Sequence, residues 1–344
     1  FWSYLTPLVT ILSVHFYLKF FDSEKINSVL DWVIIITFFG MILNLLDLTW
    51  IMQFFVKRAI YDSVNDSARG FSSFYPEQSR ISEQMGLILF SYLLLGSLNK
   101  KRLFFLILAG GLSFAAQFAV VTLEVGISFL IAAFIIIFVK RKISKIYLFL
   151  LIASCVFALL LFFYGISTML WLMKNTTLPT RGIEAVYIIL NNGTRGFGSD
   201  VGVVVKISGL IASIATIIHT PLVFEIGAPL NPDYQSILGP AYFKIENFIF
   251  GNEKLVFFTY RVFSALGNWI VDFGLIGLIL ASIFLFFLWH RSVTDKSKNK
   301  FILLWATGFL TFCFFIKINA ANPSIWALSS LIMYKLSSIK ESSP

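Results

Sequence analysis

The stretch Val262–Trp289 reads VFSALGNWIVDFGLIGLILASIFLFFLW and contains a single ionisable residue, Asp272. A continuous apolar run of this length is long enough to cross the hydrocarbon core of a bilayer as a helix. Backbone amides in hydrocarbon need partners within their own segment or within a closed barrel, and strands of a barrel alternate apolar with polar residues. This stretch does not alternate, so the sequence predicts a membrane-spanning helix.

Similar apolar stretches recur along the whole chain. Hydrophobic residues make up 58% of the 344 residues and charged residues 13%, an apolar excess that a soluble core of this length does not hide. The sequence therefore predicts an all-α, polytopic transmembrane helix bundle, a single domain over 1–344 with about nine spans. The chain starts at Phe1 without an initiator Met, and we expect a truncated start with room for helices upstream. The predicted spans are 1–18, 32–56, 85–98, 103–118, 120–139, 146–170, 262–289, 301–319 and 324–338.

Basic residues gather in three short loops, Asn99–Arg102, Lys140–Lys145 and His290–Lys300. The positive-inside rule places these loops in the cytoplasm and accounts for the net charge of +9 without a nucleic-acid partner. Two spans must then meet in a tight external turn near Thr122–Gly126. The same orientation places two larger polar regions outside, described next.

The first external loop, 57–84, contains Arg69 and then the run Pro76-Glu77-Gln78-Ser79-Arg80. Proline at an early position with an acid in the first turn is typical of a helix start, so we expect the next span to begin here. That helix would hold Glu77, Arg80 and Gln84 on neighbouring turns at the membrane surface. The alternative is an ordinary capped helix whose charges only position it.

The second external region, 171–260, contains Arg181 and Arg195 on either side of an amphipathic segment that ends in the glycine-rich run Gly193–Gly202. Glycines let backbone amides approach a phosphate closely, although a flexible turn with a solvated arginine explains the same pattern. Further along, Val203–Phe224 favours an interfacial or re-entrant helix over an extra span, and we expect short helices in this loop.

His219 is the external histidine. It would act as a general base if Glu184 or Glu225 oriented it, and otherwise it is structural.

Four ionisable residues interrupt the apolar stretches: Asp47, Glu124, Asp272 and Lys317. A charge in lipid is a functional hypothesis by default. Glu124 falls in the predicted external turn and Lys317 near an external end, so snorkelling explains both of them. Each of the four lies close to a predicted span end.

Three short motifs follow one another along the chain. The first is Arg69-Gly70-Phe71 with the helix start at Pro76, and the second is Arg181 followed by Gly193–Gly202. The third is Asn268–Gly277, which reads NWIVDFGLIG at the start of a span. This order resembles the repeat-unit polymerases of bacterial surface polysaccharides, the O-antigen polymerases of the Wzy type. The related O-antigen ligases share the layout and are the nearest rival.

Two positions depart from the pattern of that family. Gly267 stands where many relatives carry a histidine before the asparagine, and the turn at Thr122–Gly126 lacks the Ser-Arg of many members. A histidine role at position 267 is therefore not carried over to this chain.

The resemblance implies a glycosyltransferase of the bacterial inner membrane that joins polyprenyl-pyrophosphate-linked oligosaccharides at the periplasmic face. Arginines would bind the departing pyrophosphate, because the guanidinium stays charged and binds phosphate oxygens through two hydrogen bonds. Either Glu77 or His219 would take the acceptor proton. We expect no metal and no cofactor, because no carboxylate cluster appears and Cys155 and Cys313 lie in apolar stretches. The candidate pyrophosphate ligands are Arg69, Arg80, Arg181, Arg195 and Arg261.

The bilayer and a polysaccharide chain-length regulator are the further partners that this resemblance suggests. Two other classes stay open. A lipid-linked sugar or polysaccharide transporter would place polar groups at the midplane of the bilayer, often with broken helices. A structural subunit of an assembly complex would tolerate arginine substitution.

Overall fold

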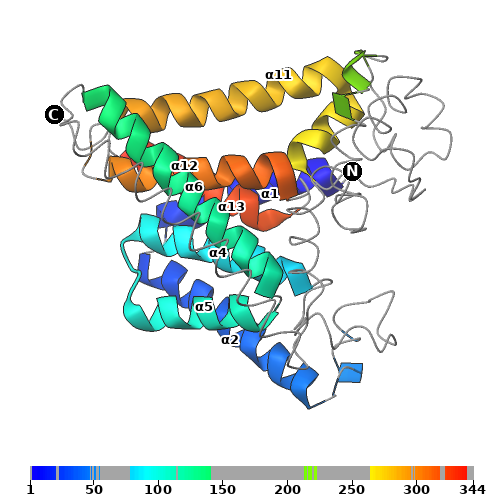
Figure 1. Cartoon of the computed structure of the whole chain (residues 1–344), viewed down its shortest axis with the longest axis vertical. Coiled ribbons are helices and arrows are strands. Elements are labelled where there is room, and N and C mark those ends of the chain that lie inside the picture. Colours follow the sequence, from blue (N-terminus) through cyan, green and yellow to red (C-terminus); the bar gives the residue numbers. More distant parts are fainter. Residues whose placement is uncertain are drawn as a thin grey trace, which may run out of the picture. The chain divides into compact units, whose positions relative to one another are not determined.

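The computed structural model describes residues 2–20, 23–46, 48, 50–51, 54, 78–113, 115–140, 213–214, 216–218, 221–222, 264–295, 297, 299–317 and 322–338. Every regular element in these ranges is a helix, as the sequence predicts. Each predicted apolar stretch overlaps one of them, apart from 146–170, which lies outside the described residues. The elements in chain order are α1 (Trp2–Phe20), α2 (Ser23–Leu45), α4 (Gln78–Leu95), α5 (Lys100–Ser113), α6 (Ala115–Lys140), α11 (Ala265–Thr294), α12 (Lys300–Phe312), the π-helical turn η4 (Cys313–Lys317) and α13 (Pro323–Ser338) (Figure 1).

The chain divides into two compact units. One comprises Phe16–Glu184 with Phe301–Ala306 and is called here the α4 unit. The other comprises Phe1–His15, Ala185–Lys300 and Thr307–Pro344 and is called the α11 unit.

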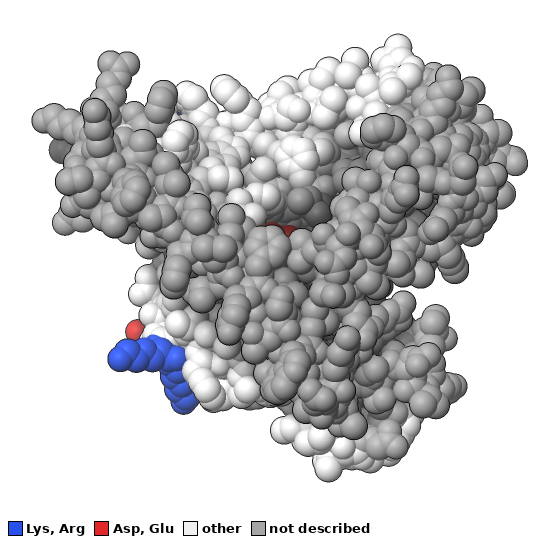
Figure 2. Space-filling model, viewed as in Figure 1, with Lys and Arg blue, Asp and Glu red and all other residues white. Residues whose placement is uncertain are grey.

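Two of the described helices are long and apolar enough to cross a membrane, Glu24–Leu45 of α2 and the whole of α11. The most apolar window of each is only 33% and 39% buried, whereas the core helix of a soluble protein buries most of its apolar surface. The exposed side chains are themselves large and apolar, for example Trp32 and Phe39 on α2 and Ile283 and Phe286 on α11. On the face seen in Figure 2, the described surface is almost entirely uncharged.

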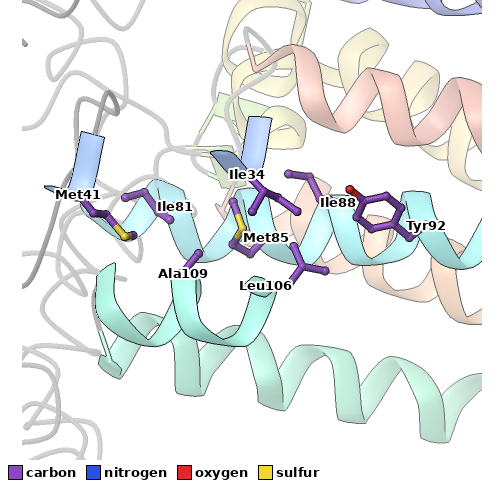
Figure 3. Packing of buried hydrophobic residues seen from close by; sticks show 8 residues of the cluster. All are labelled: Ile34, Met41, Ile81, Met85, Ile88, Tyr92, Leu106 and Ala109. Atoms are coloured by element: carbon purple, nitrogen blue, oxygen red, sulfur yellow. The ribbon is translucent and has the colours of Figure 1, made fainter. Parts of the chain in front are cut away.

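Helix α4 is the centre of the α4 unit and is buried on nearly all sides. Its side chains at 81, 85, 88 and 92 form one stripe with helical spacing that packs against α2 and α5. Figure 3 shows these side chains along the length of α4. The cluster comprises Ile34, Met41, Ile81, Met85, Ile88, Tyr92, Leu106 and Ala109.

A tight turn joins α4 to α5. Gly96 has a φ of 69°, the left-handed conformation common just after a helix, and the N–H of Ser97 donates to the carbonyl of Tyr92 at 3.0 Å. Helix α5 then starts with a side-chain cap, because Oδ1 of Asn99 accepts from the N–H of Arg102 at 2.8 Å. Local sequence therefore defines both ends of this turn.

An ion pair next to this turn ties three helices together. The Asp31 carboxylate of α2 accepts from Nε of Arg102 at 2.9 Å and from its Nη2 at 2.6 Å. The hydroxyl of Tyr92 on α4 donates to the same carboxylate at 2.6 Å, and the guanidinium lies 4.7 Å from the Tyr92 ring. Nη1 of Arg102 also donates to the carbonyl of Ser97. A two-point pair of this kind fixes orientation as well as distance.

The start of α12 packs between α4 and α6 within the α4 unit. The indole N–H of Trp305 donates to the carbonyl of Val125 at 2.9 Å. Its ring packs edge-on against Phe90 of α4 and Phe129 of α6. This contact joins residues 180 positions apart in the sequence.

In the α11 unit, hydroxyl groups connect α11 to the later part of α12. The hydroxyls of Ser292 and Thr307 are 2.9 Å apart, and the indole N–H of Trp289 donates to the Thr311 hydroxyl at 3.0 Å. Ser292 and Thr307 are both buried. Interhelical hydrogen bonds of this kind help to join helices whose remaining surface is apolar.

The predicted turn at Thr122–Gly126 is wrong. Helix α5 ends at Ser113 and α6 runs from Ala115 to Lys140, so residues 122–126 lie inside α6. A single glycine with no proline nearby does not break a helix, whereas α5 ends soon after a glycine pair. Glu124 is therefore not in an external turn. It lies about 14 Å from the start of α6 and is 6% exposed.

Candidate functional site

Most of the sequence-predicted site residues lie outside the described residues. These are Arg69, Glu77, Arg181, Arg195, His219 and Arg261. The helix start predicted at Pro76–Glu77 is confirmed within two residues, because α4 begins at Gln78. Arg80 therefore lies in the first turn of α4, although its side chain is outside the description. Convergence of these residues on one substrate stays a prediction.

The third sequence motif, Asn268–Gly277, lies at a break in α11. Gly274 has φ 57° and ψ −133°, which interrupts the helix after Phe273. An L-amino acid rarely adopts this conformation, so glycine is required for the break. The N–H of Leu275, directly after the break, donates to the carbonyl of Pro221 at 2.8 Å. Figure 1 shows the short first segment of α11 turning away from the long second one.

The two segments of α11 fold against each other. A β-carbon placed on Gly277 would lie 1.9 Å from the carbonyl oxygen of Trp269 and 2.4 Å from its carbonyl carbon. In a straight helix these residues would be separated by about 12 Å along the axis. The two glycines of the motif therefore have different roles. Gly274 allows the backbone conformation of the break, and Gly277 allows the two segments to approach each other closely.

An aromatic cluster packs against both segments. Trp269 of the first segment stacks on Trp326 of α13, with ring centroids 5.8 Å apart, and meets Phe314 edge-on at 5.6 Å. Phe284 of the second segment contacts the same two rings, each at 5.8 Å. Trp326 and Phe314 are fully buried, so this cluster is a packed core and holds the first segment in place.

The first segment, 265–273, has a side-chain cap. The hydroxyl of Ser264 accepts from the N–H of Gly267 at 2.9 Å, and the side-chain amide of Asn268 donates to the carbonyl of Ser264 at 3.0 Å. Asn268, which belongs to the third sequence motif, therefore helps to cap the N-terminus of the segment. The N–H of Gly267 is the donor to the cap.

Two polar groups lie on this segment near the break. Asp272 is 6% exposed, and the indole nitrogen of Trp269 is buried without a hydrogen-bond partner in the described part of the chain. The two residues are three positions apart and share one side of the helical segment. Both groups are buried, and Asp272 takes part in a further interaction within the chain.

Two further carboxylates are buried in the α4 unit, Glu83 on α4 at 4% exposure and Glu124 on α6. The hydroxyl of Ser82, beside Glu83, donates to the carbonyl of Gly110 on α5 at 3.2 Å. Glu83 is not among the site residues predicted from the sequence. Its spacing of three residues from Arg80 in the predicted helix is the sequence feature that could have identified it.

Comparison of the chain with protein-family models, with curated proteins and with solved structures found no match.

Proposed function

We propose that the chain is a multi-pass protein of the bacterial inner membrane with about nine spans and an active face in the periplasm. The two long apolar helices with exposed apolar faces support the membrane part of this proposal. The exposed Lys100 and Lys101 at the α4–α5 turn support a cytoplasmic position for that turn.

Within that membrane, the protein acts as a repeat-unit polymerase of surface polysaccharides. It joins oligosaccharides that are linked to polyprenyl pyrophosphate, and the pyrophosphate linkage of the donor supplies the driving force. Arg69, Arg80, Arg181, Arg195 and Arg261 are the candidate ligands for the departing pyrophosphate. The order of the three motifs along the chain is the sequence argument for this function.

The structural observation that best supports the proposal is the break in α11 at the third motif. It separates the short segment that carries the buried Asp272 and the Trp269 indole from the long apolar segment that follows. From Leu275 to Thr294, α11 is about 30 Å long, which is enough to span the bilayer without the first segment. With His290 and Arg291 at the cytoplasmic end, the first segment lies at the outer surface, where a lipid-linked glycan is presented.

A transporter is the second candidate, because broken helices are typical of transporters. In that class, discontinuous helices usually place the break near the midplane of the bilayer. The break in α11 leaves a full span on one side and about 13 Å of helix, 265–273, on the other. This asymmetry favours chemistry at the outer face over passage through the bilayer.

Reconstitution of the purified protein in liposomes with polyprenyl-pyrophosphate-linked repeat units tests the proposal. A polymerase produces a ladder of longer lipid-linked glycans. A ligase transfers single units to an added lipid acceptor, and a transporter moves the lipid-linked unit to the other leaflet without elongating it. Either of the latter results, or no product at all, contradicts the proposed polymerase.

The arginine assignment has its own test in the same assay. Arg69→Ala and Arg181→Ala each remove a candidate contact with the leaving group, and a fall in rate on the order of 10²-fold is expected. Lys101→Ala is the matched control, because it removes an exposed cation at the opposite face. Unchanged polymer length and amount in both arginine variants contradicts the assignment.

A further inference from the structure

The C-terminal end of α11 carries two basic residues on a surface of large apolar side chains. His290 is exposed and Arg291 is partly exposed. In the two turns before them, Ile283, Phe286 and Phe287 are 60%, 70% and 46% exposed. Helical spacing places these five residues on one side of α11. This end of the helix therefore combines positive charge with an exposed apolar face.

Hydrogen bonds to α12 fix the direction of this face. The indole N–H of Trp289 donates to the Thr311 hydroxyl at 3.0 Å. The hydroxyls of Ser292 and Thr307 are 2.9 Å apart, and both residues are fully buried. The side of α11 that carries the two basic residues therefore faces away from α12.

The two basic side chains are not needed to cap the helix. Cations near a helix C-terminus often bind its last carbonyl groups. Here the Thr294 hydroxyl donates to the carbonyl of His290 at 2.8 Å. The N–H of Asp295 donates to the carbonyl of Arg291 at 3.0 Å. These carbonyl groups thus have other donors.

Asp295 does not neutralise Arg291, although it follows by four residues, a spacing at which a carboxylate and an arginine can pair. Its two carboxylate oxygens accept from the N–H and the hydroxyl of Ser297. Among the described residues, no carboxylate forms an ion pair with Arg291. The guanidinium charge is therefore available to a ligand.

Both basic side chains are turned back onto the apolar face. The guanidinium carbon of Arg291 lies 5.4 Å from the centroid of the Phe287 ring. The His290 ring stacks on Phe286, with the ring centroids 5.8 Å apart. Helical side chains lean towards the N-terminus of their helix, which in the proposed orientation leads into the bilayer. A cation that only snorkelled would extend the other way, towards cytoplasmic water.

This end of α11 also has the depth of a lipid phosphate. The helix rises about 24 Å from Leu275 to Arg291, and the hydrocarbon core of a bilayer is about 30 Å thick. With the break at the outer surface, the guanidinium lies near the inner boundary between hydrocarbon and headgroups. A phosphate there can accept two hydrogen bonds from the guanidinium, while acyl chains cover the exposed rings.

We propose that His290 and Arg291 bind the phosphate of an anionic phospholipid. This site rests on the membrane location proposed above and not on the polymerase function. The guanidinium binds two phosphate oxygens, the imidazole N–H binds a third, and the acyl chains lie along Ile283, Phe286 and Phe287. An anionic lipid is favoured over a zwitterionic one, because a choline or ethanolamine group brings a second positive charge close to Arg291.

The first test compares two lipids with the same acyl chains. The purified protein in nonionic detergent is titrated with phosphatidylglycerol or with phosphatidylcholine, and native mass spectrometry measures the lipid-bound fraction. The wild-type protein binds phosphatidylglycerol about 10-fold more tightly or better. Arg291→Gln removes the preference. Arg291→Lys keeps part of it, because lysine keeps the charge and loses the two-point contact.

Lys101→Gln is the matched control for this titration. It removes one exposed cation at the α4–α5 turn, on the same side of the membrane in the proposed topology, and it keeps the preference. Equal loss in both variants assigns the preference to overall charge and overturns the site. A preference that Arg291→Gln leaves unchanged overturns it as well. Lipid-free dimers that Phe286→Ala separates would assign the face to a second copy of the chain, with the same consequence.

A second measurement needs no variant. Phosphatidylglycerol with a photoreactive diazirine in its acyl chain is cross-linked to the wild-type protein in liposomes, and the modified peptides are mapped by mass spectrometry. Label that concentrates on residues 283–287, and that unlabelled phosphatidylglycerol displaces better than phosphatidylcholine, supports the site. Label spread evenly over exposed apolar positions such as Trp32 of α2, or displaced equally by both lipids, overturns it.

Alkaline carbonate extraction separates this inference from the membrane location on which it rests. A chain that carbonate releases from membranes contradicts the location itself. A chain that stays in the membrane and binds the two lipids equally leaves the location standing and overturns the lipid site.

Discussion

Gly277 lies against the carbonyl of Trp269 so closely that a β-carbon on it would be 1.9 Å from the oxygen. Gly277→Ala is therefore expected to destabilise the protein, because both clashing atoms belong to the backbone and cannot rotate away. Overpacking of this kind costs at least about 1 to 3 kcal/mol. Reversible unfolding in mixed detergent micelles measures the change.

The matched control for this prediction is Gly111→Ala in α5, where a β-carbon would meet nothing within 4 Å. Alanine there leaves stability unchanged or raises it by up to about 1 kcal/mol, because it is the better helix former. Equal stability of the two variants would show that the segments of α11 do not fold together.

Gly96 and Gly274, the described glycines with positive φ, are expected to respond differently to asparagine. Gly96 has φ 69° just after α4, a position where asparagine is an accepted substitute. Gly274, with φ 57° and ψ −133°, lies in a region that asparagine also avoids, and the strain is about 1 to 3 kcal/mol. Gly96→Asn should thus unfold close to wild type in the micelle assay, and Gly274→Asn clearly earlier. Similar unfolding of both variants contradicts the break.

The ion pair between Asp31 and Arg102 is expected to couple α2 to α5. The side chains are 38% and 20% exposed, so solvent screening reduces the coupling free energy to about 1 kcal/mol. A double-mutant cycle with Asp31→Ala and Arg102→Ala measures it by unfolding. Lys101→Ala, a change of the exposed neighbour, is the control and stays within about 0.5 kcal/mol of wild type. A coupling near zero would mean that the pair orients the helices without stabilising them.

The proposed topology predicts that two introduced cysteines lie on opposite sides of the membrane and are labelled under different conditions. In a background with Cys155→Ser and Cys313→Ala, Ser67→Cys reports on the first external loop and Lys101→Cys on the α4–α5 turn. A membrane-impermeant maleimide added to intact spheroplasts labels position 67, and it labels position 101 only after the membrane is opened. The reverse pattern inverts the orientation and removes the argument for a periplasmic site.

The parts of the fold that could be predicted are those that depend on interactions between residues close together in the sequence. The start of α4 near Pro76–Glu77 follows from helix-start preferences of adjacent residues, and the α4–α5 turn from Gly96 and Asn99. The turn at Thr122–Gly126 was wrong because it was placed to satisfy span lengths, although no residue there ends a helix. Here the continuous helix places Glu124 in buried surroundings that the predicted turn had excluded.

The break in α11 lies in a motif that the sequence identified, but the sequence did not indicate the break itself. The sequence identified Asn268–Gly277 as a motif and Asp272 as a costly residue, and the structure found both at the break in α11. Residue types alone did not reveal the break, because the same sequence around Gly274 is compatible with a straight apolar helix.

By itself, then, the sequence determined that this chain forms apolar helices, because transfer of backbone and side chains between water and lipid depends on local composition. The tertiary structure decided where α11 breaks and which carboxylates are buried. The break depends on the carbonyl of Pro221, which accepts from Leu275, and on the rings of Phe314 and Trp326, which hold Trp269. Those partners are distant in sequence, so only folding brings them to the site.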